Sequence, residues 1–386
     1  MNTSATTISG VGAVTGYGWG RDRLWSGLTS GKSCASLHPG FGTSLDDPGW
    51  VARIPDDGDS ADGKTRFSRA MRWSAREAIH DAMARGWTPG PRVGLISAVV
   101  LGDLDMFPMI VPGTAASFTG REYVSVTPST PVSLLMQEFG FHGPAMSVSA
   151  MCTSGIGAVI TAKIWLDSGM ADDVIVVATD LSATPEVVRM FVQLGVAITD
   201  VDFLDSCRPF QQGSRGFGFG EASVAFTMTN RPSAGYGRVL GGSMSHDAFH
   251  ATSVDPTLTQ VTACVDAALA SAGVGGADIR YLNAHGPGTA QCDAAEGAIA
   301  RTRTPNAEVF SVKPLAGHCQ AAAGAVELAA TLLGHQHGGL PAPPQVADPA
   351  FPAVLNGSAP MEHGLTLKTS LGMGGHNAAV VIGPMS

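Results

Sequence analysis

The sequence predicts an α/β protein built from two similar halves, and three features of the chain support this prediction. Strand-like runs at residues 93–100, 174–178 and 279–283 alternate with helical patterns, as they do in layered α/β folds. The run at 174–178 is apolar at every position, which is typical of a strand covered on both faces. The length of 386 residues suits two closely packed halves better than one small domain.

An internal repeat indicates that the halves are duplicates. Residues 216–226 (GFGFGEASVAF) resemble residues 370–381 (SLGMGGHNAAVV), since each is a glycine turn that runs into an apolar strand. Upstream of each turn, a strand, a short loop and a helix of small residues follow one another. The first of these loops contains Cys152 and the second contains His318.

The junction between the halves is placed at residues 230–236, where NRPSAGY has the turn-forming residues of a linker. The N-terminal half then spans 1–232 and the C-terminal half 233–386. Hydrophobic residues make up 44% of the chain and charged residues 14%. This composition predicts a large buried core and fits a further buried subunit interface.

Charge, cysteine usage and hydropathy argue against several classes of protein. A net charge of -9 is unfavourable for a nucleic-acid binder. The six cysteines include no Cys-x-x-Cys pair, and His335 and His337 lie close to neither cysteine nor carboxylate in the sequence, so no metal site is expected. Without a signal-peptide pattern or a run of about 18 apolar residues, we expect a cytoplasmic protein with no membrane span.

Cys152 is the candidate nucleophile. It lies in the segment SAMCTSG, where small residues allow other backbone to approach and a helical pattern follows. A cysteine in the first turn of a helix lies at the positive end of the helix dipole, which is expected to lower its thiol pKa. The alternative is a buried structural cysteine. We keep that interpretation for the other five, of which Cys319 is expected nearest the site.

Two histidines and a lysine are the further catalytic candidates. His285 lies in NAHG, and Lys313 with His318 lies in SVKPLAGH. Each histidine follows a strand-like run, so each is expected to point from a strand end into a cleft. Neutral imidazoles in a cleft can donate hydrogen bonds to a developing oxyanion. The alternative is a surface or core histidine, our interpretation of the remaining histidines.

The ordered set of Cys152, His285, Lys313 with His318, and the glycine turn at 372–375 resembles the β-ketoacyl synthases, which form carbon–carbon bonds in fatty acid and polyketide assembly. The likeness begins at GVGAVTG near the N-terminus and extends to the last strand. It implies the thiolase-like fold, two duplicated α/β halves in αβαβα layers. A true thiolase is disfavoured, because thiolases carry a second cysteine in this last turn.

The resemblance also implies a mechanism. Cys152 would become acylated, and His285 and His318 would stabilise the enolate that forms when a malonyl thioester loses carbon dioxide. The result is a decarboxylative Claisen condensation by ping-pong acyl transfer.

Supporting roles are implied as well. Lys313 would pair with Glu296 and orient the histidines, and the amides of Cys152 and Met373 would form an oxyanion hole. Met373 also stands at the gate to the acyl pocket. The residues expected to bind substrate are Thr289, Gly374 and Gly375.

The chain departs from the usual family pattern near these positions. Pro287 stands where a threonine usually follows histidine-glycine, so one hydrogen bond to a pantetheine arm is lost. Met373 replaces the gating phenylalanine, and Leu371 replaces the other aromatic residue of that turn. These changes favour a role in a secondary-metabolite (polyketide) pathway over standard fatty acid synthesis.

The implied partner is an acyl carrier protein, whose phosphopantetheine supplies the only prosthetic group expected. The basic stretch at 64–76 is the candidate docking helix, with Lys64, Arg66 and Arg69 as contacts; the alternative is a solvated amphipathic helix. Family members form homodimers or heterodimers with a chain-length factor.

Two other functions are open. Pro287 and Met373 also suit an acyltransferase that forms an ester or amide, or a thioester hydrolase. A non-enzymatic chain-length-factor-like partner is the third, disfavoured because such subunits lack the nucleophile and Cys152 is present.

Overall fold

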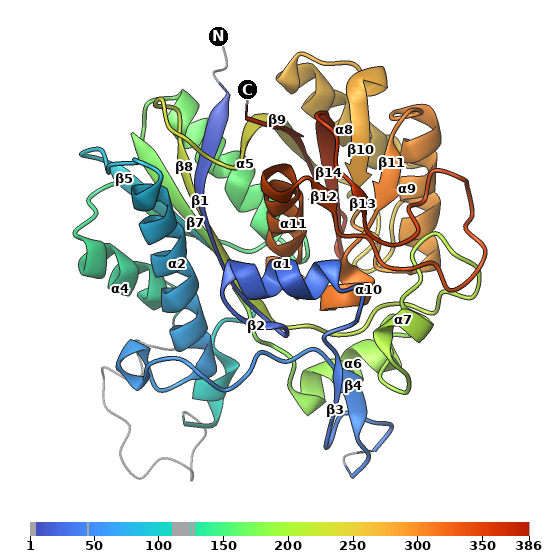
Figure 1. The fold of residues 1–386 in the computed structure, drawn as a ribbon. Helices are drawn as coiled ribbons and strands as arrows, with labels where there is room; N and C mark the ends of the chain where they lie inside the picture. The colour runs from blue at the N-terminus through green and yellow to red at the C-terminus, as the bar shows by residue number, and fades with distance from the viewer. Residues whose placement is uncertain (1–4, 45, 110–123, 125–126, 128, 386) are drawn as a thin grey trace.

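The computed structural model describes residues 5–44, 46–109, 124, 127 and 129–385 (Figure 1). Its main feature, in the described residues, is one mixed sheet of 11 strands: each half of the chain contributes five strands to the main order, and the short β2 (Gly18–Trp19) pairs with β1. The strands of the first half are β1 (Thr6–Thr15), β5 (Val93–Ala98), β6 (Ala145–Val148), β7 (Asp173–Asp180) and β8 (Ala222–Thr229). The strands of the second half are β9 (Gly237–His246), β10 (Ile279–Asn283), β11 (Glu308–Phe310), β14 (Leu365–Gly372) and β15 (His376–Gly383).

The two halves have the same topology, which confirms the predicted duplication. The spatial order is β6-β5-β7-β8-β1 in the first half and β11-β10-β14-β15-β9 in the second. If the five strands of each half are numbered along the chain, their order across the sheet is 3-2-4-5-1 in both halves. The parallel and antiparallel pairings also correspond. The first strands, β1 and β9, pair antiparallel and join the half-sheets.

Helices complete the predicted αβαβα layers. The outer helices of the first half are α2 (Arg66–Ala84) and α4 (Thr130–Phe139), and those of the second are α8 (Thr259–Ala272) and α9 (Ala290–Thr302). Between the half-sheets lie α5 (Ser154–Asp167) and α11 (Ala323–His337) (Figure 1). Among the described residues, no helix has the length and apolar character to cross a membrane.

Shorter elements connect these layers. They are β2 (Gly18–Trp19), α1 (Arg21–Thr29), β3 (Ser36–His38), β4 (Gly49–Val51), α6 (Pro185–Gln193), α7 (Phe203–Ser206), α10 (Lys313–Ala316), β12 (Gly339–Leu340), β13 (Ala359–Pro360) and the 3₁₀ turns Ser60–Asp62, Leu104–Met109, Gly276–Asp278 and Gln320–Ala322. The linker expected at 230–236 is the connection between β8 and β9.

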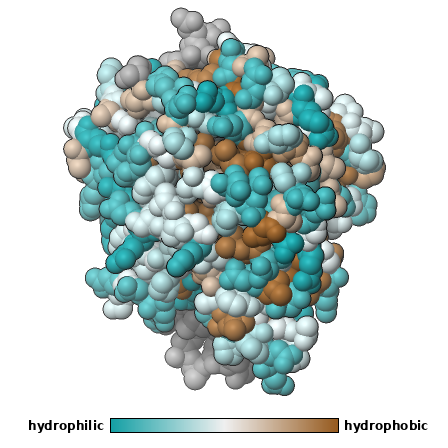
Figure 2. All heavy atoms as spheres, turned by 45° about the vertical axis from the view of Figure 1, so that its right-hand side comes forward, coloured by the Kyte–Doolittle hydropathy of each residue, from teal (hydrophilic) through white to brown (hydrophobic). Residues whose placement is uncertain are grey.

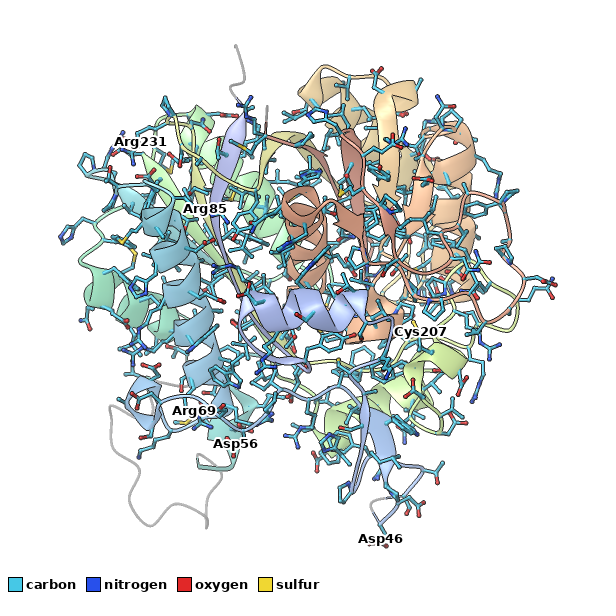
Figure 3. The ribbon with its side chains drawn as sticks, viewed as in Figure 1. Asp46, Asp56, Arg69, Arg85, Cys207 and Arg231 are labelled. Atoms are coloured by element: carbon cyan, nitrogen blue, oxygen red, sulfur yellow. The ribbon has the colours of Figure 1, made fainter. Side chains whose placement is uncertain are left out.

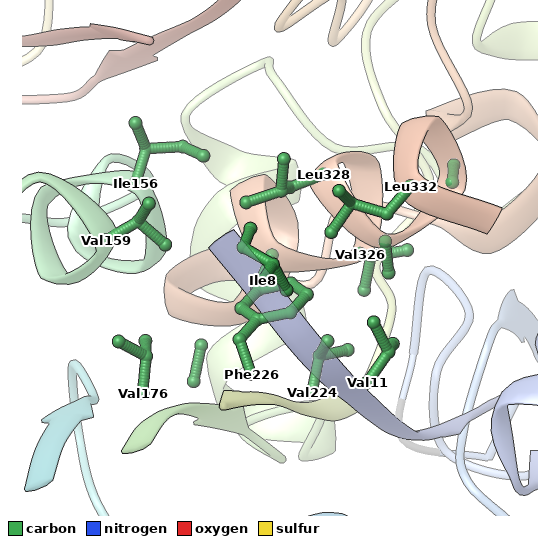
Figure 4. Packing of buried hydrophobic residues seen from close by; sticks show 14 of the residues in the cluster. Ile8, Val11, Ile156, Val159, Val176, Val224, Phe226, Val326, Leu328 and Leu332 are labelled. Carbon is green, nitrogen blue, oxygen red and sulfur yellow. The ribbon is translucent and has the colours of Figure 1, made fainter. Parts of the chain in front are cut away.

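The core lies around the two central helices. Helix α5 consists mostly of small and apolar residues and is buried on nearly all sides, so it packs between both half-sheets. Figure 4 shows side chains of α5 and α11 packed over those of β1, β7 and β8. On the outside, apolar residues reach the surface in patches among polar ones on the face shown in Figure 2.

Glycine in β1 permits the close approach of α2. A Cβ atom on Gly12 would lie 2.0 Å from the carbonyl oxygen of Ser74 and 2.8 Å from the backbone nitrogen of Ala78. We therefore expect Gly12→Ala to lower the free energy of unfolding by about 3 kcal/mol through overpacking. Urea denaturation followed by circular dichroism measures this. Gly339→Ala is the control, because its Cβ would meet neighbours only at 3.6 Å or more; equal stability of both variants would contradict the prediction.

Candidate active site

The three main candidates come together at the start of the central helices. Cys152 precedes α5, His318 precedes α11, and His285 follows β10. The Cys152 Sγ and one ring nitrogen of each histidine lie within 4.8 Å of one another, and all three residues are buried. The imidazole rings are 5.4 Å apart between centroids and nearly perpendicular. One cavity therefore presents a thiol and two imidazoles to the same point.

The wall of this cavity combines apolar side chains with a few polar groups. Its lining residues are Cys152, Phe191, Val196, Phe217, Thr252, Ser253, Val254, His285, Pro287, Thr289, Gln291, Cys292, His318, Gln320, Leu371, Gly372 and Met373. Thr289 is thus placed as expected, whereas Gly374 and Gly375 shape the turn behind Met373 without lining the cavity. Cys319 lies outside the wall, where its thiol donates to the carbonyl oxygens of Ala316 and Gly317.

A tight turn presents Cys152. Met151 has a φ of 49°, in the left-handed region that a bulky side chain rarely adopts. Ser154 holds the turn: its Oγ accepts from the amide of Ala150 at 2.8 Å and donates to the carbonyl of Met151 at 2.6 Å. Cys152 therefore precedes the N-cap Thr153, and is not within the first helical turn as the sequence suggested.

The expected low thiol pKa of Cys152 is wrong for this state of the protein. Burial raises the pKa to about 11, against the opposing effects of Lys313 and of the Met373 amide. Desolvation of the thiolate is the largest effect, because the charged form loses its water when it is buried. The resting nucleophile is a neutral thiol.

Both histidines are held as neutral hydrogen-bond donors. The amide of Gln320 donates to His318 Nδ1 at 3.1 Å, and Lys313 Nζ lies 3.1 Å from His285 Nδ1. With Nδ1 accepting, the proton of each neutral ring is on Nε2. Burial and then the charge of Lys313 hold the pKa of both rings well below the usual value. Each ring therefore offers an Nε2–H.

The predicted pairing of Lys313 with Glu296 is wrong. Lys313 Nζ instead forms an ion pair with Glu327 of α11 and donates to the carbonyl of His285. Glu296 accepts from the amides of His285 at 2.6 Å and Gly286 at 2.7 Å, and from Thr369 Oγ1 at 2.6 Å. These three donors satisfy its carboxylate, so Glu296 fixes the loop that carries His285.

Lys368 and Glu327 are site residues that the sequence reasoning missed. Lys368 Nζ lies 2.7 Å from Glu327 Oε2, which places one carboxylate between two buried ammonium groups. Both charges stand alone in apolar segments, in α11 and β14. An isolated charge in a segment buried on all sides signals a buried partner, since such a charge is rarely stable unpaired.

The hydrogen bonds argue against a metal at this trio, although cysteine and histidine are zinc ligands. A ring nitrogen must be free of a proton to bind a metal. Here the Nδ1 atoms of His285 and His318 accept hydrogen bonds from other groups, and the Nε2 atoms carry the protons, so neither nitrogen is available. Outside this trio, no group of three cysteine, histidine or carboxylate ligands comes together in the described parts of the chain.

The two glycine turns of the repeat brace the site from opposite halves. The amide of His318 donates to the carbonyl of Gly218 at 2.8 Å, and the amide of Gly220 donates to the carbonyl of His318 at 3.1 Å. In the other half, Gly372 lies against the turn that carries Cys152, and the Met373 amide contacts the thiol. One backbone N–H, that of Met373, thus faces the nucleophile, and the predicted oxyanion hole would use it.

Most of the basic stretch is neutralised within the chain. Arg66 makes a two-point ion pair with the buried Glu221, at 2.7 and 3.2 Å, so it is an internal structural residue. Arg69 pairs with Asp56 (Figure 3) and donates to the carbonyls of Asp57 and Lys64. Lys64 is exposed. Docking by Lys64 and Arg69 stays a prediction, whereas the ion pair with Glu221 argues against Arg66 as a contact.

Comparison with known proteins identifies the family. The model of the β-ketoacyl synthase N-terminal domain matches residues 4–234, and that of the β-ketoacyl synthase C-terminal domain matches residues 236–346. The chain belongs to the β-ketoacyl synthase family.

Individual relatives are distant. The tetracenomycin polyketide synthase ketoacyl synthase alpha subunit of Streptomyces glaucescens is 32% identical over 64% of this chain and 61% of that protein. The 3-oxoacyl-[acyl-carrier-protein] synthase 2 of Coxiella burnetii is 26% identical over 99% of both. A solved ketosynthase from Xenorhabdus doucetiae, in complex with its chain length factor, superposes with a TM-score of 0.85 at 24% identity, over 99% of this chain and 98% of that one. That likeness shows the thiolase-like fold.

The carboxyl of Asp293, on α9 beside the cavity, gives a test of site electrostatics. Burial raises its pKa to about 7, although the Phe210 amide donates to it at 2.9 Å. A carboxyl whose folded pKa exceeds its unfolded value of about 3.9 stabilises the fold at low pH, and this contribution is lost as the pH rises to about 7. Asp293→Asn should therefore lessen the fall in stability between about pH 4 and 7.

Unfolding free energies in urea at about pH 5 and about pH 8 check this prediction. Asp200→Asn is the control, because Asp200 is half exposed in a surface ion pair with Arg215. A pH dependence of Asp293→Asn equal to that of the wild type would contradict it.

Proposed function

We propose that this chain is a condensing β-ketoacyl-carrier-protein synthase. The observation that carries the proposal is the convergence of the Cys152 thiol with two Nε2–H imidazoles in one buried cavity. A thiol nucleophile accepts an acyl group, and two neutral donors stabilise an enolate without protonating it.

The first half-reaction is acyl transfer. The Cys152 sulfur attacks the thioester carbonyl of an acyl carrier, a carbon–sulfur bond forms, and the carrier's sulfur leaves and takes up the thiol proton. The amide of Met373 beside the sulfur is suited to hold the oxyanion of the tetrahedral intermediate.

The second half-reaction forms the carbon–carbon bond. A malonyl thioester loses carbon dioxide, and the electron pair left behind forms an enolate whose oxygen accepts from His285 and His318. The enolate carbon attacks the acyl-Cys152 carbonyl, and Cys152 leaves as a thiolate, which takes up one proton from solvent to restore the thiol. Lys313 keeps His285 in the required tautomer.

The alternatives fit the geometry less well. Acyl transfer to an alcohol, an amine or water needs a general base near Cys152. Both imidazoles are instead held as donors by partners at Nδ1. The chain-length-factor-like hypothesis is disfavoured because Cys152 lines the cavity.

Carrier and subunit partners extend the proposal. One similar solved structure is a type II polyketide synthase acyl-carrier protein in complex with its ketosynthase, and others pair a ketosynthase with its chain length factor. We infer that this chain also takes substrates from an acyl carrier protein, in polyketide or fatty acid biosynthesis. A cytoplasmic location, and the need for no cofactor beyond the carrier's phosphopantetheine, stay predictions.

Strand β6 is the proposed subunit contact. It forms an edge of the sheet, and Ala145, Met146 and Ser147 are exposed on it. An exposed strand edge is a template for pairing with another chain. We therefore propose that a second chain of the same fold, most simply another copy, pairs along β6.

Substitution of the catalytic candidates tests the condensation. Cys152→Ala should abolish acylation. His285→Ala and His318→Ala should retain it but slow decarboxylation by about 10²–10³-fold, because an oxyanion donor is lost. Intact-protein mass spectrometry measures acyl-Cys152, and carbon dioxide release from a malonyl carrier measures the second step.

His142→Ala is the control for these variants, since His142 is exposed and outside the cavity lining. Normal condensation by Cys152→Ala would refute the proposal.

A charge on the β6 edge tests the subunit contact. Met146→Asp should convert dimers to monomers, because a carboxylate would be buried at the contact. Sedimentation equilibrium measures the mass. Met190→Asp on α6 is the matched control, since Met190 is also exposed. A wild-type chain that sediments as a monomer would argue against the homodimer.

A further inference from the structure

Gln320 is a polar residue at the centre of the site that the mechanism above does not use through its side chain. It lies between His318 and α11, lines the cavity and is 4% exposed. Its φ of 43° is in the left-handed region, so the backbone is constrained there. The backbone N–H of Gln320 donates to His318 Nδ1 and so fixes the tautomer of that ring. The side chain of Gln320 lies beside the Cys152 sulfur.

The side chain faces the sulfur with one end and has no partner at the other. Gln320 Oε1 lies 4.0 Å from Cys152 Sγ, the outer limit for a hydrogen bond from a thiol. Gln320 Nε2 is buried and has no hydrogen-bond partner among the described residues. A buried amide donor without a partner is unfavourable for folding, so its retention indicates a group that it meets during the reaction.

The reaction creates such a group. When the new carbon–carbon bond forms, the bond between Cys152 Sγ and the acyl carbon breaks, and the sulfur keeps the electron pair as a thiolate. Cys152 is buried, so this anion is poorly solvated and depends on nearby donors. The Met373 amide is one such donor. Gln320 Nε2 becomes a second if the amide rotates, and rotation breaks no hydrogen bond at Nε2.

We propose that Gln320 is a further catalytic residue that pairs with Cys152 in both protonation states. Its Oε1 accepts from the thiol, and after rotation about the Cγ–Cδ bond its Nε2 donates to the thiolate. The role in turnover rests on the proposed condensation, but the pairing with the sulfur does not.

Other charged and titratable groups also act on Cys152 and must stay constant in a test. They are His285, Cys292, Lys313, His318, Asp180 of β7 and Glu327 of α11. Substitution at position 320 keeps the backbone amide that pairs with His318. Variants at this position therefore differ from the wild type mainly in what faces the sulfur.

Alkylation of Cys152 by iodoacetamide tests the pairing without any carrier or acyl substrate. Gln320→Ala removes the donor and opens the cavity. Easier access alone predicts faster alkylation, whereas loss of the donor raises the thiol pKa by about one unit and slows alkylation about tenfold at pH 8. Gln320→Glu keeps the size but offers an anion in place of a donor, so it should slow alkylation at least as much. Mass spectrometry of proteolytic peptides gives the rate at Cys152 apart from the five other free cysteines.

Gln336→Leu is the control, since Gln336 is exposed on α11 and pairs with Arg85; its rate should equal that of the wild type. Circular dichroism shows whether each variant is folded. If Gln320→Ala does not fold, the alkylation rate of Gln320→Glu by itself tests the pairing. Unchanged or faster alkylation in a folded position-320 variant overturns the pairing. Slower alkylation in a chain that condenses nothing would keep the pairing and reject only the proposed function.

Discussion

The site depends on the contact between the two central helices. A Cβ on Gly155 of α5 would lie 3.0 Å from the carbonyl of Ala321, and one on Gly324 of α11 would lie 2.6 Å from the side chain of Ile156. These glycines let the N-terminal ends of the helices meet. Because the halves are duplicates, the loop before each helix occupies the equivalent place, so Cys152 and His318 arrive at one point from opposite halves.

Burial sets the chemistry of that point. It raises the pKa of the Cys152 thiol and lowers the pKa of both imidazoles, so three neutral groups line one cavity. Neutral imidazoles suit enolate stabilisation, since they donate without transferring a proton. Lys313, whose charged group lies beside His285, is itself paired with the buried Glu327, which also pairs with Lys368. A buried ammonium is stable only when it is paired in this way.

Departures from the family pattern gather at this cavity. Pro287 and Met373 change its wall, where a threonine and a phenylalanine are usual in the family. The scaffold that supports the thiol and the imidazoles is otherwise intact, with a glycine turn of each half bracing the loop of the other.

The sequence by itself determined the duplicated α/β layers, and the identities of Cys152, His285 and His318 as candidates, because strand and helix patterns and the small residues around a reactive group are local properties. Only the tertiary structure decided that Lys313 pairs with Glu327, that Arg66 is tied to Glu221, and that the Cys152 thiol is neutral. Partner choice and desolvation depend on segments that are distant in the chain and on how completely they exclude water. Neither partner choice nor desolvation produces a periodic pattern in the sequence, although an isolated charge in an apolar segment, such as Lys368, indicates a buried partner.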